Sequence, residues 1–353
     1  MTRFAPDTGF APRPSFVAVD PYVSDSPPAA LHLADNTNVF GVPPTALAEV
    51  LAATAEQVLQ YPPSSGPALR EAIASYLDVK PNEVVLGCGA DGVMDCAFRA
   101  FCEPGEGVTF PVPTFMMSRY FALTNGLTPI PVAMHSDGSI DVDGLLAARA
   151  SVIYVCAPNN PTGVQPSAVD LRTLLERATG IVVIDEAYAE FAGETLVADV
   201  LQQDRAIVVR TFSKAFGLAG LRVGYAIGAP ALMLEIEKAR GPFAVSSVAL
   251  RAATAAITSD LPWVQARVKD AIASRDELVR LLRALGLAPL PSAANFVLVP
   301  VAGARQIAER LAQRGIAVRA FTQLPGVGDA LRITAGPLDA MRRVADALSE
   351  LGS

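Results

Sequence analysis

Histidine, cysteine and lysine are scarce in this 353-residue chain, and their scarcity excludes several kinds of site. The two histidines, His32 and His135, are far apart and no C-x-x-C pair is present, so neither a Cys/His zinc site nor a Ser-His-Asp triad is expected, and no metal ligand is assigned. The four cysteines are predicted to be free thiols in a reducing compartment. Lysine occurs only four times, so Lys214, in an apolar and glycine-rich segment, is conspicuous.

Basic runs and long apolar runs are also absent. The net charge is −7, the isoelectric point is about 5.0, and no run of Lys or Arg exceeds two residues, so nucleic acid is not an expected partner. Mean hydropathy is +0.36, yet no stretch approaches the roughly 18–20 uncharged apolar residues that a membrane span needs. Residues 1–20 lack the apolar core of a secretory signal. A cytoplasmic protein without a membrane partner is therefore predicted.

The length and the pattern of apolar segments predict an α/β fold with more than one domain. Hydrophobic cores stop growing at about 250–300 residues, which favours two of them here. Short apolar segments alternate with helical patterns, as expected for a mainly parallel sheet covered on both faces. The predicted strands are 83–87, 108–110, 151–156, 181–184, 206–210 and 223–227. The predicted helices of this part are 45–60, 68–77, 91–102, 114–124 and one within 166–178.

Beyond Gly241 the pattern changes to long helices and short strands. Helices are predicted at 246–257, 264–285 and 338–350, and strands at 296–299, 317–319 and 331–334. We expect an N-terminal arm (residues 1–40) that joins a small domain, a large domain that carries the ligand (41–240), and a C-terminal small α+β domain (241–353). Because parallel sheets place their chemistry beyond the carboxyl ends of the strands, the loops after those ends are where a site is expected.

The first candidate loop, Gly87-Cys-Gly-Ala-Asp-Gly92, lies between a predicted strand and a predicted helix and fits G-x-G-x-x-G. Its backbone N–H groups and the helix dipole would face an anion. A dinucleotide site is one interpretation and a plain tight turn is another. The acidic residue expected about 20 residues later has no good match, so the loop favours a phosphate at a helix N-terminus over a dinucleotide.

Two further loops follow buried strands. After 151–156, A-P-N-N-P-T-G places Asn160 before a proline, which holds an extended backbone and presents the amide at the edge of the sheet, although an ordinary Asn-Pro turn is an alternative. After 181–184, D-E-A-Y places Asp185 where a buried carboxylate costs free energy unless it is paired, and a cationic ligand group would pair it. Tyr188 can lie on the same side three residues later. A helix N-cap is the alternative role for Asp185.

The segment 211–224, T-F-S-K-A-F-G-L-A-G-L-R-V-G, follows another predicted strand. Lys214 lies among small and apolar residues, where desolvation would lower the pKa of its amine. A neutral amine can form a Schiff base with a carbonyl. Ser213 and Arg222 could bind a phosphate, the arginine through two parallel donors. A solvated surface lysine fits this segment poorly.

Together these loops predict one ligand that carries a phosphate, a carbonyl, a cationic ring nitrogen and a ring hydroxyl. Pyridoxal 5'-phosphate (PLP) has all four groups. The convergence of four loops on one molecule is far more specific than any single motif.

With these residues in place, the chain resembles the fold-type I, class I/II aminotransferases, and among them most the histidinol-phosphate aminotransferases. The resemblance runs from about residue 21 to residue 337, and its specific blocks are APNNPTG, DEAY and TFSKAFGLAGLR, in the family's order and spacing. It implies a PLP-transferase fold of type I, with a large PLP-binding domain built on a mainly parallel seven-stranded sheet and a smaller α+β domain.

The resemblance also implies roles for individual residues. Lys214 matches the catalytic lysine that forms the Schiff base with PLP. The implied cofactor contacts are Ala90, Asp91, Ser213 and Arg222 at the phosphate, Asp185 at the ring nitrogen, Asn160 and Tyr188 at the ring hydroxyl, and Phe115 stacked on the ring. Tyr61 matches a tyrosine that reaches the phosphate of the neighbouring subunit's cofactor, which implies a homodimer with shared active sites. The positions that match substrate contacts are Tyr22, Asn36, Arg319 and Arg332.

Several positions near the expected substrate depart from the family. Thr37 and Val39 replace the Glu and Pro of an N-E-N-P pattern, and Gly92 replaces a usual Glu. Phe115 stands where a Tyr usually stacks on the ring, so the aromatic face is kept and a hydroxyl is lost. The expected substrates are an amino donor, histidinol phosphate or a related amino compound, and a 2-oxo acid, 2-oxoglutarate.

Other functions stay open at this point. An aminotransferase for aromatic or other amino acids fits the departures at Thr37 and Phe115. A PLP-dependent threonine-phosphate-type decarboxylase shares the cofactor but releases CO₂ and no keto acid. A dinucleotide-dependent dehydrogenase would leave Lys214 and its segment without a role. A non-catalytic regulator of this fold would need an added basic DNA-binding domain, for which the chain has no room.

Overall fold

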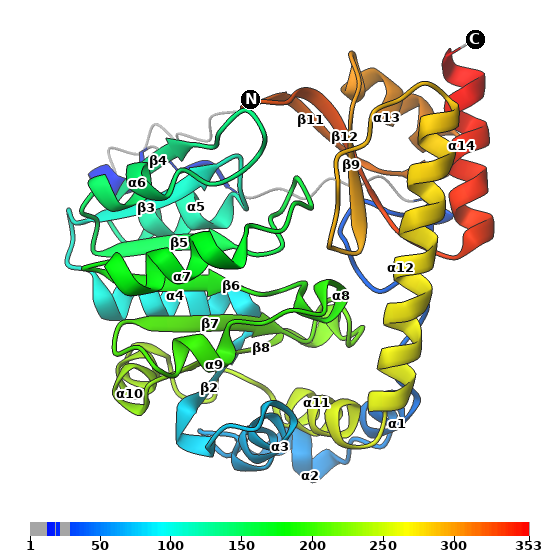
Figure 1. Ribbon diagram of the computed structural model, residues 1–353. Coiled ribbons are helices and arrows are strands. Elements are labelled where there is room, and N and C mark those ends of the chain that lie inside the picture. Colours follow the sequence, from blue (N-terminus) through cyan, green and yellow to red (C-terminus); the bar gives the residue numbers. More distant parts are fainter. Residues whose placement is uncertain (1–12, 18, 22–28, 353) are drawn as a thin grey trace, which may run out of the picture.

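The computed structural model describes residues 13–17, 19–21 and 29–352, and this part of the chain forms three β-sheets (Figure 1). The largest sheet has seven strands in the order β2-β8-β7-β6-β5-β3-β4. Their bounds are Val84–Cys88 (β2), Gly107–Val112 (β3), Thr128–Ala133 (β4), Val152–Cys156 (β5), Ile181–Asp185 (β6), Ala206–Thr211 (β7) and Val223–Gly228 (β8). β8 runs antiparallel to both neighbours and the other pairs are parallel, so the predicted mainly parallel sheet is confirmed.

Strand β4 is missing from the strands that the sequence predicts, because Pro129 and Pro131 interrupt its apolar pattern. Proline cannot donate to a ladder, so it is tolerated on an edge strand. β4 is such a strand and pairs only with β3, from Gly107↔Thr128 to Val112↔Ala133. The other six strands of the sheet lie within two residues of their predicted ends.

The described residues form five α-helices that the sequence did not predict, at 142–147, 189–192, 197–200, 230–239 and 304–313. The helices otherwise follow the predicted order. Their bounds are α1 (Pro44–Leu51), α2 (Ala55–Leu59), α3 (Pro67–Leu77), α4 (Gly89–Phe101), α5 (Met117–Thr124), α6 (Val142–Ala147), α7 (Ala168–Arg177), α8 (Ala189–Ala192), α9 (Val197–Val200), α10 (Pro230–Ala239), α11 (Ser247–Thr258), α12 (Leu261–Ala284), α13 (Ala304–Gln313) and α14 (Leu338–Gly352). The single helix predicted at 45–60 was wrong, because two helices form there. Thr54 Oγ1 accepts a hydrogen bond from Gln57 N, and the Gln57 side chain accepts one from Thr54 N. This capping box starts α2 as a new helix.

Both faces of the large sheet are buried. In β6, Val182 and Ile184 pack into one hydrophobic cluster and Val183 packs into another. Successive side chains of a strand point to opposite faces, so a continuous apolar strand fills two cores. Helices α4, α5 and α10 contribute to the cluster of Val183, and α3, α7 and α11 contribute to the cluster of Val182.

Two smaller sheets lie toward the C-terminal part of the chain. β9 (Phe296–Pro300), β12 (Gly328–Thr334) and β11 (Arg319–Leu324) form an antiparallel sheet in the order β11-β12-β9, which α12 and α14 flank in Figure 1. β1 (Leu31–His32) pairs in parallel with β10 (Ile316–Ala317). This pairing brings the N-terminal segment against the smaller sheets.

Helix α12 packs against two different hydrophobic clusters, that of the large sheet and that of the three-stranded sheet. Residues of α11 and of α12 up to Ala271 belong to the same cluster as Val182 of the large sheet. Leu278 and Leu282, further along α12, pack instead with Val297 and other residues of the smaller sheet. The packing therefore changes later in the chain than the boundary expected at 240/241, and the three-part division stays a prediction.

Some features are absent from the described residues. None of the helices there is long and apolar enough to cross a bilayer. In the same part of the chain, no group of three or more His, Cys, Asp or Glu side chains is arranged to hold a metal ion. The cysteines Cys88, Cys96, Cys102 and Cys156 form no disulfide.

Candidate active site

A cavity of about 450 Å³ lies where the carboxyl ends of the large sheet's strands meet β11 and β12. It brings together most of the residues that the sequence singled out. Those that line it are Asn36, Ala90, Asp91, Phe115, Asn160, Asp185, Tyr188, Ser213, Lys214, Arg222, Arg319 and Arg332. The loops after β5, β6 and β7 therefore converge at one sheet edge, as parallel strands require.

Asp185 is the last residue of β6 and is 3% exposed. Tyr154 Oη donates a hydrogen bond to Asp185 Oδ2 at 2.7 Å, and Ala187 N donates to Asp185 Oδ1 at 3.1 Å. Burial raises the pKa of Asp185 to about 6, against the effect of these two donors. These neutral donors hold the carboxylate of Asp185 in place but do not cancel its charge. The carboxylate can therefore pair with a cationic group of a ligand.

Lys214 lies in the turn after β7, and its Nζ donates to Asp35 O at 2.9 Å. Burial, and then the charge of Arg332, lower the pKa of Lys214 to about 8. A lysine with such a pKa is in part a neutral amine near pH 7 and can act as a nucleophile or a base. The turn after it depends on Gly217, whose φ is +66° and whose Cβ would lie 2.9 Å from Gly41 O.

One part of the cavity is built to hold an anion. Ala90 and Asp91 open α4, and Arg222 Nη2 donates to Asp91 Oδ2 at 3.0 Å while its Nη1 donates to Ser213 Oγ at 3.4 Å. A Cβ at Gly89 would lie 2.7 Å from Arg222 Nη2, so a larger residue at position 89 would make the guanidinium shift. A helix N-terminus, a hydroxyl and a guanidinium together suit a phosphate.

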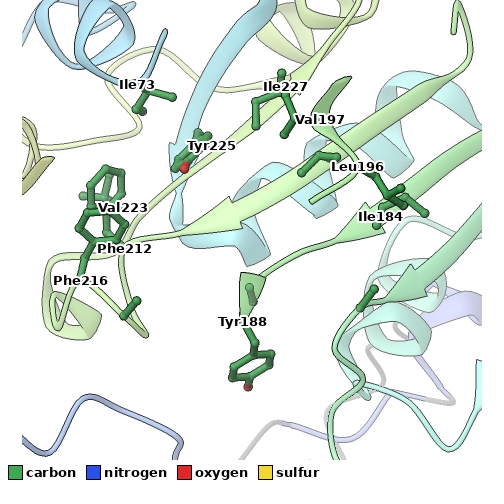
Figure 2. Close-up of a cluster of buried hydrophobic side chains, with 14 of the residues drawn as sticks. Ile73, Ile184, Tyr188, Leu196, Val197, Phe212, Phe216, Val223, Tyr225 and Ile227 are labelled. Carbon is green, nitrogen blue, oxygen red and sulfur yellow. The ribbon is translucent and has the colours of Figure 1, made fainter. Parts of the chain in front are cut away.

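Asn160 and Tyr188 supply two donors to the adjoining wall. Asn160 Oδ1 accepts a hydrogen bond from Arg332 Nη1 at 2.6 Å, so its Nδ2 is left to donate. In Figure 2 the ring of Tyr188 extends from the end of β6 away from most of the other labelled side chains. Its Oη accepts from Asn36 Nδ2 at 3.0 Å, and burial raises the pKa of Tyr188, so the hydroxyl keeps its proton. Two such donors suit an anionic ring oxygen.

Two arginines of the cavity lie on neighbouring strands of the smaller sheet. Arg319 of β11 and Arg332 of β12 are direct partners in the antiparallel register, and both line the cavity. Like charges directly opposite each other destabilise a sheet, so this pair suits an anionic ligand group that lies between or beside them. The apolar side chains that line the cavity are Phe115 and Met116, between β3 and α5, and Phe321 and Leu324 of β11.

One predicted site residue, Tyr61, lies elsewhere. Tyr61 is 81% exposed, its ring stacks on Phe243 with 4.6 Å between centroids, and it lines a separate cavity of about 770 Å³ beside α1 and α11. Tyr22 lies outside the described residues. Within a single chain, therefore, Tyr61 does not contact the site that Lys214 and Asp185 form.

Sequence reasoning missed Tyr154, which holds Asp185, and Asp35, whose carbonyl holds Lys214. Tyr154 gave one usable signal, because it is the hydroxyl-bearing residue of an apolar strand that ends two residues later. Its contact depends on the parallel register of β5 and β6, in which Cys156 is the partner of Asp185. Asp35 gave none, because a backbone carbonyl is available at every residue.

The fold and the cavity fit the expected aminotransferase class, and comparison with known proteins establishes it. The sequence matches the family of class I and II aminotransferases over residues 29–348, and the chain belongs to that family. It is therefore an enzyme, and the predicted family is confirmed.

Individual relatives agree with this assignment. The histidinol-phosphate aminotransferase of Caldanaerobacter subterraneus subsp. tengcongensis is 36% identical over 296 residues, which cover 82% of this chain and 84% of the relative. The aromatic amino acid aminotransferase of Corynebacterium glutamicum (strain R) is 38% identical over 303 residues, 83% of this chain and 87% of the relative. The crystal structure of histidinol-phosphate aminotransferase from Sinorhizobium meliloti in complex with PLP covers 98% of both chains, with a TM-score of 0.88 and 29% identity. The predicted PLP-transferase fold of type I is confirmed.

Proposed function

We propose that this aminotransferase uses PLP to move an amino group from a donor with an anionic tail, histidinol phosphate or a related amino compound, to 2-oxoglutarate. The observation that carries the proposal is the cross-strand pair of Arg319 and Arg332, which faces the same cavity as Lys214. One arginine suits the carboxylate of an amino acid or 2-oxo acid, and the second provides for a further negative charge, such as a phosphate. The relatives that act on histidinol phosphate support this choice of donor.

The residues of the cavity fit PLP. Lys214 would hold the cofactor's carbonyl carbon covalently, and Asp185 would pair with the ring nitrogen. The other groups would be held by Asn160 and Tyr188 at the ring oxygen, by Ala90, Asp91, Ser213 and Arg222 at the phosphate, and by the face of Phe115 against the ring. When bound, PLP supplies an electron sink that stabilises negative charge on the substrate's Cα.

The chain's own residues would then move and hold protons. Lys214 Nζ, with a pKa of about 8, would accept the Cα proton of the donor and return it to the cofactor carbon that had carried the carbonyl. Asp185 would keep a proton on the ring nitrogen, because its carboxylate is buried and is held by Tyr154. Arg332 orients the substrate, since its guanidinium is itself fixed by Asn160 Oδ1 and Ala34 O, each at 2.6 Å.

A second candidate function is supported by apolar residues that line the cavity. Met116, Phe321 and Leu324 offer apolar side chains on which an aromatic substrate can pack. The relative from Corynebacterium glutamicum is named for aromatic amino acids, which fits these side chains. A decarboxylase of threonine phosphate would use the same arginines and cofactor, and only its product distinguishes it.

The exposed apolar residues of α1 and α2 support a homodimer. Leu47 and Leu51 of α1, and Val58 and Leu59 of α2, are all exposed, as is Tyr61, which follows α2 in the chain. In such a dimer Tyr61 would reach the cofactor phosphate of the neighbouring subunit, which accounts for its distance from Lys214 within one chain. The mass of the purified protein by light scattering tests this, and a monomer with full activity would contradict it.

The experiment that tests the reaction follows the absorption of the PLP-loaded protein as single donors are added. Histidinol phosphate, glutamate, an aromatic amino acid and threonine phosphate are compared. The proposal predicts conversion of the cofactor to its amine form with histidinol phosphate and recovery with 2-oxoglutarate. Conversion by the aromatic donor alone would establish the second function, and CO₂ release from threonine phosphate would establish the decarboxylase.

A further inference from the structure

Three consecutive residues of the N-terminal segment each contact a different member of the site. Ala34 O accepts a hydrogen bond from Arg332 Nη2 at 2.6 Å, and Asp35 O accepts one from Lys214 Nζ at 2.9 Å. Asn36 Nδ2 donates to Tyr188 Oη at 3.0 Å. The first two contacts use backbone carbonyls, which any residue supplies. The third uses the side chain, so it depends on the identity of residue 36.

Asn36 is held in one conformation from the side of β12. It is 1% exposed, and its φ of +55° lies in the left-handed region, which asparagine tolerates better than most residues. Its backbone N donates to Thr334 Oγ1 at 3.1 Å, and its backbone O accepts from Asn295 Nδ2 at 3.0 Å. Thr334 Oγ1 donates to Leu33 O at 2.8 Å and lies 3.3 Å from Asn36 Oδ1, while Asn36 Nδ2 faces Tyr188.

This contact determines which way the hydroxyl of Tyr188 can donate. A phenolic hydroxyl has one proton, and its oxygen can accept as well. Because Oη accepts from Asn36 Nδ2, which brings its own hydrogen, the proton of Tyr188 must point elsewhere. Tyr188 lines the cavity, so the proton of its hydroxyl can point into the cavity, away from Asn36.

We infer that Asn36 is a positioning residue: it makes Tyr188 a hydrogen-bond donor toward the ring oxygen of the cofactor, rather than contacting the substrate itself. The inference rests on the proposed use of PLP. The donated bond stabilises negative charge on that oxygen, so losing it favours the protonated form of the bound chromophore.

Two variants test the hydrogen bond from Asn36 Nδ2 to Tyr188 Oη: one removes it, and the other reverses which residue donates. Asn36→Gly removes the amide and tolerates the left-handed φ. Asn36→Asp keeps the shape and offers only acceptors when ionised, so the hydroxyl of Tyr188 turns away from the cofactor to donate to the new carboxylate. The pH at which the absorption of bound PLP half-titrates is expected to rise by about half a unit to one unit in Asn36→Gly and by more in Asn36→Asp. PLP affinity, measured by equilibrium titration, is expected to fall several-fold in both variants.

Asn295→Ala is the matched control. It removes the hydrogen bond to the backbone O of Asn36 and leaves the side-chain amide untouched, so we expect lower thermal stability and an unchanged spectral titration. An equal shift in Asn295→Ala would show that loosening the segment is the cause and would overturn the inference.

The decisive comparison repeats Asn36→Gly in a Tyr188→Phe background. If Asn36 acts through the hydroxyl, the second substitution adds no further shift once that hydroxyl is gone. A full additional shift would overturn the inference, as would a wild-type titration in Asn36→Gly alone. Failure of the wild-type protein to bind PLP would instead remove the proposed function on which the inference rests.

Discussion

The two sides of the cavity are built differently. The side of Asp185 and Lys214 comes from neighbouring strands of one sheet, and each residue lies within a few positions of a strand end. The side of Arg319 and Arg332 comes from a small antiparallel sheet and is joined to the N-terminal segment by contacts such as Arg332 to Ala34 O. The first side lies on strands of the large core, whereas the strand β11 that carries Arg319 lies in the smaller sheet and contributes no residue to that core. We therefore expect substitutions on the first side to affect every donor, and those on the second to discriminate between donors.

The largest effect is expected from Lys214→Ala, on the side of the large sheet. The variant loses the amine that would hold PLP covalently and carry the Cα proton, so kcat should fall by about 10⁴-fold with all donors. PLP should still bind through its phosphate and ring contacts, and its absorption should be that of the free aldehyde. Lys238→Ala is the control, because the side chain of Lys238 is 60% exposed and pairs with Glu235. Turnover near the wild-type rate in Lys214→Ala would contradict the assignment.

A smaller but still general effect is expected at Asp185. Asp185→Asn removes the charge at the ring nitrogen, so kcat should fall on the order of 10²–10³-fold for every donor. The pKa of Asp185 is raised to about 6, so the carboxylate is charged above this pH and becomes protonated below it. PLP affinity of the wild-type apoprotein should therefore fall as pH decreases through about 6, and the step should be missing in Asp185→Asn.

Asp143→Asn is the control for this pH profile, since the side chain of Asp143 is 82% exposed. It should leave both kcat and the step in PLP affinity unchanged. A step that persists in Asp185→Asn would assign the titration to another group.

The difference between the two sides also explains how far the sequence could predict the site. Asn160, Asp185 and Lys214 could be found because each follows a buried strand, and strand order alone brings such loops to one edge. The contact of Tyr154 with Asp185 could not, because it requires knowing that β5 and β6 are neighbours and in which register. The fold class followed from the alternation of apolar strands and helices, whereas the edge strand β4 was concealed by its prolines.

Asn36 shows the same limit on the other side. Its position in the sequence suggested a substrate contact, but its hydrogen bonds run to Tyr188, Thr334 and Asn295, which are distant in the chain. Pairing over such separations depends on how the N-terminal segment packs against β12. No local pattern of residues 33–39 encodes it.

The smallest and most selective effect is expected from Arg319→Leu. If Arg319 binds the anionic tail of the donor, its loss removes a charge-assisted hydrogen bond, and KM for a phosphorylated donor should rise about 10- to 100-fold. KM for an aromatic donor should change little, because that side chain would pack on Phe321 and Leu324. Arg305→Leu, on the exposed surface of α13, is the control for the loss of one positive charge. An equal rise in KM for both donors would show that Arg319 contributes to the binding of every donor. The two sides of the cavity would then not differ in their effect on donor choice.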